Sequence, residues 1–257
     1  MPRLINRSAF LLGNLAATAH PTETSEANCE QSPCCGLGDG NGVVRVLAID
    51  PSEWELDIAR SRITDPRVTF VNGTAQEVVR VVDTDVDAIL LCNVLHQVPL
   101  PERLGVLTGA FQLVRPGGFV GANTLFYEGG IEPQTRAFYL RWIAETREYL
   151  AQASIPWSVL DNVPVALQRL TPQQHHDMFK SCGYKDIKIE EVYFDWRVDD
   201  WAALSKYSVF IQGALSPRVN LEVGSSALIH GVHAAYRALG IETVRRGWLH
   251  CAARRPW

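Results

Sequence analysis

The chain has 257 residues, of which 47% are apolar and 20% charged, a composition typical of a soluble globular protein with one large domain. Its formal net charge of -4 supplies no overall basic field, so neither nucleic acid nor an anionic membrane is expected as the main partner. No apolar run approaches the roughly 20 residues that a membrane-spanning helix needs. The six cysteines are scattered, which favours a reduced, cytoplasmic protein.

Residues 1–33 form an N-terminal segment, for which we expect a helix followed by a linker. Arg3 and Arg7 flank the start of this segment, and an apolar run follows at Ala9–Leu12. The pattern has two interpretations. We favour a helix that packs on the domain, and the alternative is a cleaved targeting peptide with small residues near Ala19 at its cleavage site.

From residue 43 onward, apolar strands alternate with amphipathic segments. Val43–Ile49 is predicted to be a buried strand with Asp50 at its carboxyl end, and Ser52 is suited to cap the next helix. Further strands are expected at 68–71, 87–92 and 119–126, with helices at 75–82 and 101–114. This alternation predicts an α/β fold with a doubly wound, mostly parallel sheet, in which ligands bind at the carboxyl ends of the strands.

The second half, residues 127–257, is predicted to contain the last two strands and two helical insertions. The strands are expected at 184–194 and 243–253, and the insertions at 127–182 and 196–240. The insertions are rich in aromatic residues, among them Phe138, Trp142 and Trp201. They are interpreted as a lid over the substrate. For any single aromatic side chain, packing in the hydrophobic core is the favoured alternative.

The order of motifs resembles the class I S-adenosylmethionine-dependent methyltransferases of the small-molecule type. The matching segments are the glycine loop Cys35–Gly40, the acidic strand end Leu47–Ser52, the turn Val68–Ala75, the strand Asp87–His96 and the turn Leu113–Gly118. The resemblance covers residues 34–126, the cofactor-binding half. It implies a Rossmann-like sheet of the seven-strand type, S-adenosyl-L-methionine as cofactor, and methyl transfer to oxygen, nitrogen or carbon of a small, partly apolar metabolite.

The resemblance also implies a role for individual residues. Asp50, followed by Pro51 and Ser52, would bind the ribose hydroxyls. The methionine part would pass Gly36, Gly38 and Gly40, the adenine would border Thr74, Ala75 and Gln76, and the sulfonium would lie beside Cys92 and Asn93.

The glycine loop departs from the family pattern. The segment before it is polar, and only 14 positions separate Gly36 from Asp50, too few for the helix and strand that the family usually has there. This shortening favours a second hypothesis, in which the fold no longer transfers methyl groups and serves as a ligand-binding scaffold or as a catalyst of a rearrangement or cyclisation.

Methyl transfer to a hydroxyl or carbon needs a base. His96 lies one turn beyond Asn93 and is the first candidate, although a structural hydrogen bond is the favoured alternative for this residue. Tyr127 and Glu128 are the next candidates, with the same alternative. The histidine pairs at 175–176 and 230–233 lack a third ligand at suitable spacing, so no metal site is expected. A small-molecule substrate is the expected partner; a homodimer is compatible with the sequence.

Overall fold

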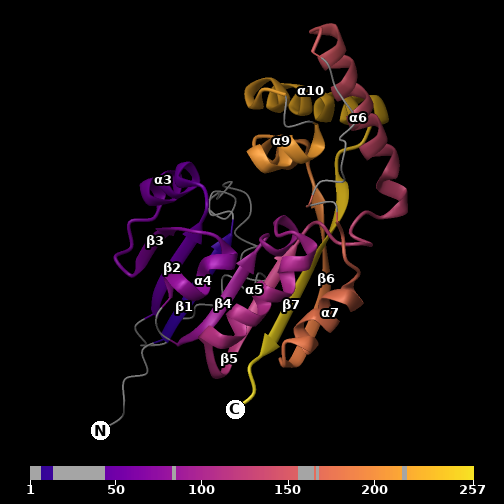
Figure 1. Ribbon diagram of the computed structural model, residues 1–257. Helices are drawn as coiled ribbons and strands as arrows, with labels where there is room; N and C mark the ends of the chain where they lie inside the picture. The colour runs from indigo at the N-terminus through magenta and orange to yellow at the C-terminus, as the bar shows by residue number, and fades with distance from the viewer. Residues whose placement is uncertain (1–6, 14–43, 83–84, 156–164, 166–167, 216–218) are drawn as a thin grey trace. The chain divides into compact units, whose positions relative to one another are not determined.

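The computed structural model describes residues 7–13, 44–82, 85–155, 165, 168–215 and 219–257 (Figure 1). The chain divides into two compact units. The first comprises Met1–Thr124, Pro172–Glu190 and His250–Trp257, and the second comprises Leu125–Thr171 and Glu191–Leu249. Two segments that follow the expected boundary near residue 126, Pro172–Glu190 and His250–Trp257, therefore belong to the first unit, because the last two strands contribute to both units.

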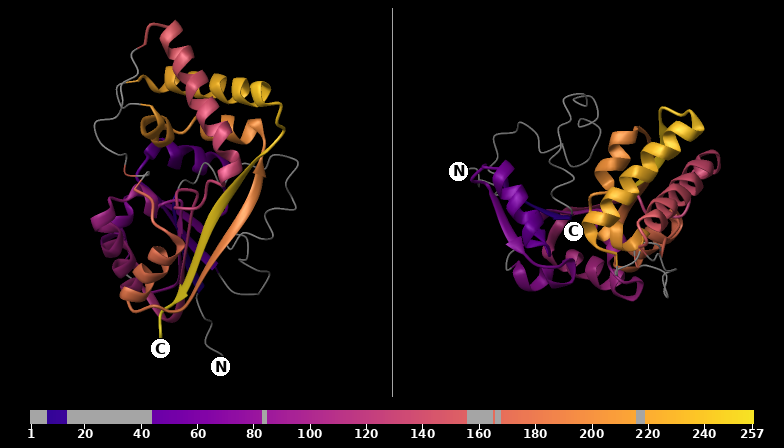
Figure 2. Two further views of the ribbon diagram at one scale, coloured as in Figure 1. Left: turned by 90° about the vertical axis from the view of Figure 1, so that its right-hand side faces the viewer. Right: turned by 90° about the horizontal axis from the view of Figure 1, so that it is seen from above.

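Within the described ranges, the sheet has seven strands in the order β3-β2-β1-β4-β5-β7-β6. Strands β1 to β5 pair in parallel, whereas β7 runs opposite to β6 (Figure 2). The order reverses between β1 and β4, as expected of the predicted doubly wound, Rossmann-like sheet. The bounds are β1 Arg7–Gly13, β2 Val44–Asp50, β3 Val68–Asn72, β4 Val86–Cys92, β5 Val114–Thr124, β6 Lys185–Trp196 and β7 Val244–Arg254.

The prediction of a helix within residues 1–33 is wrong for Arg7–Gly13, which forms strand β1. The strand lies between β2 and β4 and pairs in parallel with both. Two neighbouring strands satisfy the backbone hydrogen bonds of this apolar run, which a helix would otherwise satisfy internally. The chain thus has the first strand of such a sheet. This strand lies upstream of the polar segment that precedes the glycine loop.

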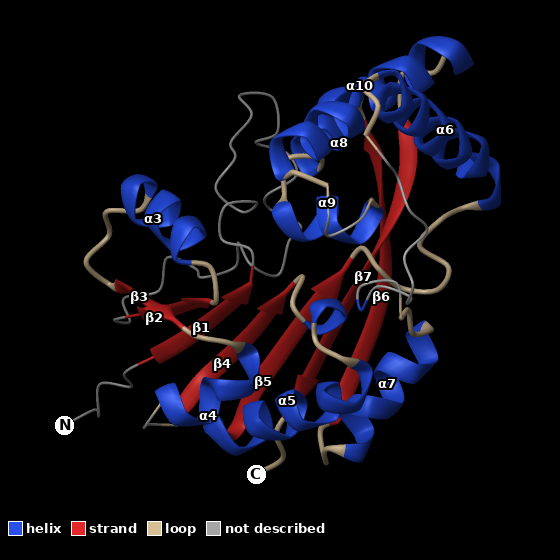
Figure 3. Cartoon of the chain, turned by 45° about the horizontal axis from the view of Figure 1, so that its top comes forward, coloured by secondary structure: helices blue, strands red, loops and turns tan. Residues whose placement is uncertain are grey.

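Helices of the first unit cover both faces of the sheet. Figure 3 shows α4, α5 and α7 along one face and α3 on the opposite face. Their bounds are α3 Glu53–Arg62, α4 Val78–Val81, α5 Leu100–Leu113 and α7 Pro172–Ser181, with short 3-10 turns η1 Ala75–Glu77 and η2 Leu95–Gln97. Strand β5 begins earlier than expected, at Val114, and its register against β4 shifts at the Pro116 turn, where the backbone lacks a donor.

The second unit is built around α10 (Leu221–Leu239), which packs on α6 (Arg136–Gln152), α8 (Val198–Leu204) and α9 (Ser208–Ala214). A 3-10 turn, η3 (Pro133–Thr135), precedes α6. The rings of Phe138, Trp142 and Trp201 are at most 3% exposed and contact one another at centroid distances of 5.3 to 5.5 Å. These three aromatic residues are core residues, as the favoured alternative predicts.

Candidate cofactor-binding site

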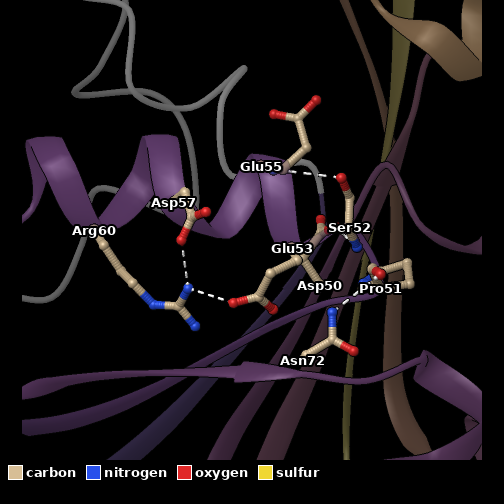
Figure 4. Close-up of polar contacts among 8 residues, drawn as sticks. All are labelled: Asp50, Pro51, Ser52, Glu53, Glu55, Asp57, Arg60 and Asn72. Atoms are coloured by element: carbon tan, nitrogen blue, oxygen red, sulfur yellow. Dashed lines mark hydrogen bonds and ion pairs between the residues drawn. The ribbon is translucent and has the colours of Figure 1, made fainter.

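Asp50 is the acid at the carboxyl end of β2. Its side chain is buried, and its Oδ1 accepts a hydrogen bond from the backbone N–H of Ser52 at 2.8 Å (Figure 4). Burial raises the pKa of this carboxyl, and the hydrogen bond from Ser52 opposes that rise. The second oxygen makes no hydrogen bond to any described residue, so it is left to accept hydroxyl groups of a ligand.

The turn after β2 fixes this carboxyl. Ser52 caps α3 as predicted, its Oγ accepting the N–H of Glu55 at 3.3 Å. Asn72, the last residue of β3, donates from Nδ2 to the carbonyl of Pro51 at 3.1 Å. The ends of β2 and β3 are therefore tied together around Asp50.

Glu55 is a second buried acid beside Asp50, and the sequence analysis assigned it no site role. Its Oε2 is buried without a hydrogen-bond partner among the described residues. Burial raises the pKa of Glu55, and the charge of Asp50 raises it further. In the sequence, only the position of Glu55 in the first turn after the Ser52 cap could have indicated a site role. An acid is common at that position in any helix, because its charge interacts favourably with the helix dipole.

Asn93 and Cys92 lie at the end of β4, next to the end of β1, where Gly13 pairs with Cys92. Cys92 is buried, and Asn93 adopts a φ of 56°, in the left-handed region that asparagine tolerates. The N–H of Asn93 donates to Oδ1 of Asn123 at 2.9 Å, whereas the buried Oδ1 of Asn93 has no partner in the described part of the chain. This acceptor lies where the strand order reverses, the place where such sheets bind ligands.

Gly13 is a site position that the sequence analysis missed. It ends β1 at the reversal point. A glycine directly after an apolar run was the available signal. The predicted glycines Gly36, Gly38 and Gly40 lie outside the described residues.

The turn after β3 contains the predicted adenine neighbours. The hydroxyl and N–H of Thr74 both donate to Oε2 of Glu77, at 2.8 and 3.1 Å, and these bonds lower the pKa of Glu77. Ala75 is buried, and Gln76 is exposed and donates to Glu102 at 3.0 Å. These hydrogen bonds hold the turn, which lies at the same edge of the sheet as Asp50.

His96 is enclosed in the first unit. Its side chain is 5% exposed, and Nδ1 lies 3.0 Å from Oγ1 of Thr124. Burial, aided by the charges of Arg103 and His175, lowers the pKa of His96 to about 3. A neutral, enclosed imidazole bonded to β5 fits the structural alternative better than the role of a base.

Tyr127 and Glu128 belong to the second unit. Tyr127 is fully buried and donates to Oε2 of Glu191 at 2.9 Å. Burial raises the pKa of Tyr127 far above its ordinary value, and its hydrogen bond to Glu191 adds to that rise. Glu128 has an exposed side chain, while its N–H donates to the carbonyl of Leu170 at 2.9 Å. Of the two, only Glu128 presents an accessible acid–base group.

A cavity of about 410 Å³ in the second unit is lined by Glu132, Asp195 and Arg245, among others, and contains none of the predicted site residues. Arg245 pairs with Glu132 at 3.6 Å. In the described ranges, no group of three or more histidine, cysteine, aspartate or glutamate side chains is placed to hold a metal ion. No helix there combines the length and apolar character that a bilayer span requires.

A family model described as a methyltransferase domain matches residues 35–118. A comparison with curated protein sequences finds no match. Among solved structures, the YcgJ protein from Bacillus subtilis is similar with a TM-score of 0.53 and 12% identity, over 98% of this chain and 93% of that one. The complex between the Haloferax volcanii Trm112 methyltransferase activator and a methyltransferase gives a TM-score of 0.50 and 13% identity, over 98% and 84%. The [4+2]-cyclase SpnF also gives 0.50, with 15% identity, over 98% and 76%.

At such low identity the structural likeness shows the fold, and the family model adds the domain type. Residues 35–118 are therefore similar to a methyltransferase domain, and the chain shares the Rossmann-like fold of solved methyltransferases.

Proposed function

We propose that the chain transfers the methyl group of S-adenosylmethionine to a small, partly apolar molecule. The observation that carries this proposal is Asp50, a buried acid at the end of β2 with one oxygen left for a ligand. An ionised carboxylate is a strong acceptor for two adjacent ribose hydroxyls. The family-model match over the same segment supports the assignment.

The residues at the ends of β2 and β4 fit the two polar parts of this cofactor. Asp50 would hold the ribose, and the unpartnered Oδ1 of Asn93 is an acceptor suited to the amino group of the methionine part. Glu55 adds a second acceptor beside Asp50. When bound, the cofactor supplies a methyl group on a positively charged sulfur, and the contribution of the chain is alignment of the acceptor.

The base, where the acceptor needs one, is proposed to come from Tyr127 or Glu128 rather than from His96. His96 is enclosed and has its pKa lowered to about 3. Glu128 is the stronger candidate because its side chain is exposed, whereas Tyr127 is buried and its pKa is raised by burial.

A transfer assay tests the proposal. The full chain would be incubated with methyl-labelled S-adenosylmethionine and a panel of small apolar molecules carrying hydroxyl, amine or acidic C–H groups. Label is expected in one product class, and at limiting S-adenosylmethionine Asp50→Asn should lower the rate of labelling roughly 10- to 100-fold. Asp57→Asn is the matched control, because Asp57 is an exposed acid on α3 that pairs with Arg60. An unchanged rate of labelling in Asp50→Asn would contradict the assignment.

A second function has a specific observation in its favour. The fold is shared with a protein described as a [4+2]-cyclase, which agrees with a rearrangement or cyclisation without methyl transfer. In that case the product carries no label, and Asp50→Asn leaves product formation unchanged.

We place the reaction in the cytoplasm. The described cysteines Cys92, Cys182 and Cys251 are free thiols, which agrees with a reducing compartment. Measuring where the full-length chain fractionates in its own cells checks this placement.

A further inference from the structure

Two arginines are packed inside the second unit without an acidic partner. Arg246, on β7, is 4% exposed, and Arg169 is largely buried in the segment before α7. Burial lowers the pKa of both groups. Neither forms an ion pair with any described carboxylate.

Arg246 lies beside Tyr139 on α6, and the charge of Arg169 acts on that tyrosine. The guanidinium of Arg246 lies 6.0 Å from the centre of the Tyr139 ring. Burial raises the pKa of the Tyr139 hydroxyl, and the charge of Arg246, a side-chain hydrogen bond with Arg246 and the charge of Arg169 oppose that rise. The charge of Arg169 also acts on Arg246. Two like charges therefore lie near one aromatic hydroxyl.

Several polar atoms of this cluster lack hydrogen-bond partners among the described residues. Arg246 donates from Nη2 to the carbonyl of Leu125, but its Nη1 is buried and unpartnered. The same holds for Nε of Arg169, and for Nε1 of Trp248, which lies two positions from Arg246 and so on the same face of β7.

Buried cations without a counter-ion are costly, and unsatisfied donors beside them add to the cost. An oxyanion would offset both, because a carboxylate or phosphate accepts several hydrogen bonds from a guanidinium fork. Of the acids near this part of β7 in the described chain, Glu191 already accepts from Tyr127 and Tyr193, and Glu132 pairs with Arg245. Among the described residues, therefore, no acid pairs with the two arginines, and an anionic ligand would supply that partner.

We propose that Arg246, Arg169 and Tyr139 form a binding site for the carboxylate or phosphate group of a small-molecule ligand. The anion site itself does not depend on methyl transfer.

The test measures anion binding to the full chain without any cofactor. Thermal unfolding would be followed in titrations with inorganic phosphate and, separately, with benzoate, at constant ionic strength set with chloride. We expect one of these anions to raise the unfolding midpoint in a saturable way. The larger shift distinguishes a phosphate from a carboxylate as the preferred group.

Arg246→Met and Arg169→Gln are expected to weaken that binding at least tenfold. Arg245→Met is the matched control, because Arg245 is the neighbouring, exposed arginine of β7 and should leave the shift unchanged. Arg169→Gln keeps the test decisive if Arg246→Met fails to fold. No saturable shift with either anion, or an equal shift in Arg169→Gln and the wild type, would overturn the proposal. Since S-adenosylmethionine is absent, the result is independent of whether methyl transfer occurs.

Discussion

Asp50 is held by the fold in a place that disfavours its charge. Burial raises its pKa, so the stability it contributes is present below its ordinary pKa of about 3.8 and is lost as the pH rises through the folded value. The fold therefore makes the ionised form of Asp50 costly. Such a cost is expected of a group kept for binding rather than for stability.

Replacing Asp50 with asparagine should therefore stabilise the free protein at neutral pH. We expect Asp50→Asn to have an unfolding free energy at pH 7.5 equal to or above that of the wild type, with the gain shrinking as the pH falls toward 4. Urea unfolding measures this, with Asp57→Asn as the exposed control. A loss of stability at pH 7.5 in Asp50→Asn alone would show that its charge is stabilised by the fold.

His96 predicts a pH dependence of the opposite sign. The folded pKa is lowered to about 3, so its contribution is complete above about pH 6.5 and is lost as the pH falls from there toward 3, because only the unfolded chain takes up the proton. Between pH 7.5 and 5.0 this residue alone should remove about 2 kcal/mol of unfolding free energy. His96→Gln should lose less stability over that interval, as urea unfolding at both pH values would show.

His230, with an exposed side chain, is the control for that experiment. His230→Gln should keep the wild-type difference between the two pH values. An unchanged difference in His96→Gln would mean that the imidazole is not enclosed in solution.

At the scale of elements, the Ser52 hydroxyl, which the family resemblance assigns to the ribose, caps α3, and we propose that it supports the binding turn rather than contacting the cofactor. Ser52→Ala should lower the unfolding free energy by about 0.5–2 kcal/mol, since the N–H of Glu55 loses its acceptor. The N–H of Ser52 still donates to Asp50 in this variant, so S-adenosylmethionine affinity should change little. Urea unfolding and calorimetry check the two halves of this prediction.

Ser61→Ala is the control on the same helix, because Ser61 is exposed and donates only to the carbonyl of Ile58 in the last turn. Its effect on stability should be smaller. Equal losses in the two variants would mean that the cap contributes nothing.

The core of the second unit depends on Trp142. Its ring is 3% exposed, and Nε1 donates to the carbonyl of Leu228 on α10 at 2.9 Å. Trp142→Ala should cost about 3–5 kcal/mol of unfolding free energy. Leu140→Ala, on the exposed face of the same helix, should stay within about 0.5 kcal/mol of the wild type. Denaturant unfolding of both variants tests whether α6 packs as described, and similar losses in the two would contradict it.

Elements with local signals were predictable. Strand β2 followed from its continuous apolar residues, and the start of α3 followed from Ser52 and the acids after it. Strand β1 was not predictable in this way, because a short apolar run such as Ala9–Leu12 suits a helix or a strand equally well. Only its pairing with β2 and β4 decides, and that pairing joins residues far apart in the sequence.

The whole-molecule arrangement explains why the candidate site was only partly predictable. Asp50 and Asn93 each follow a recognisable strand, so their place at the sheet edge could be deduced from topology. The role of Gly13 depended on recognising β1. Arg169 and Arg246 are widely separated in the sequence, and neither occurs in a motif, so their joint effect on Tyr139 could be recognised only from the fold.

The central claim is that the edge around Asp50 binds S-adenosylmethionine, and calorimetric titration of the full chain with that compound tests it most directly. The wild type should bind, and Asp50→Asn should bind roughly 10- to 100-fold more weakly, since hydrogen bonds to a charged group contribute about 1.5–3 kcal/mol. No binding to the wild type at high micromolar concentration, or equal binding by the two proteins, would contradict the claim.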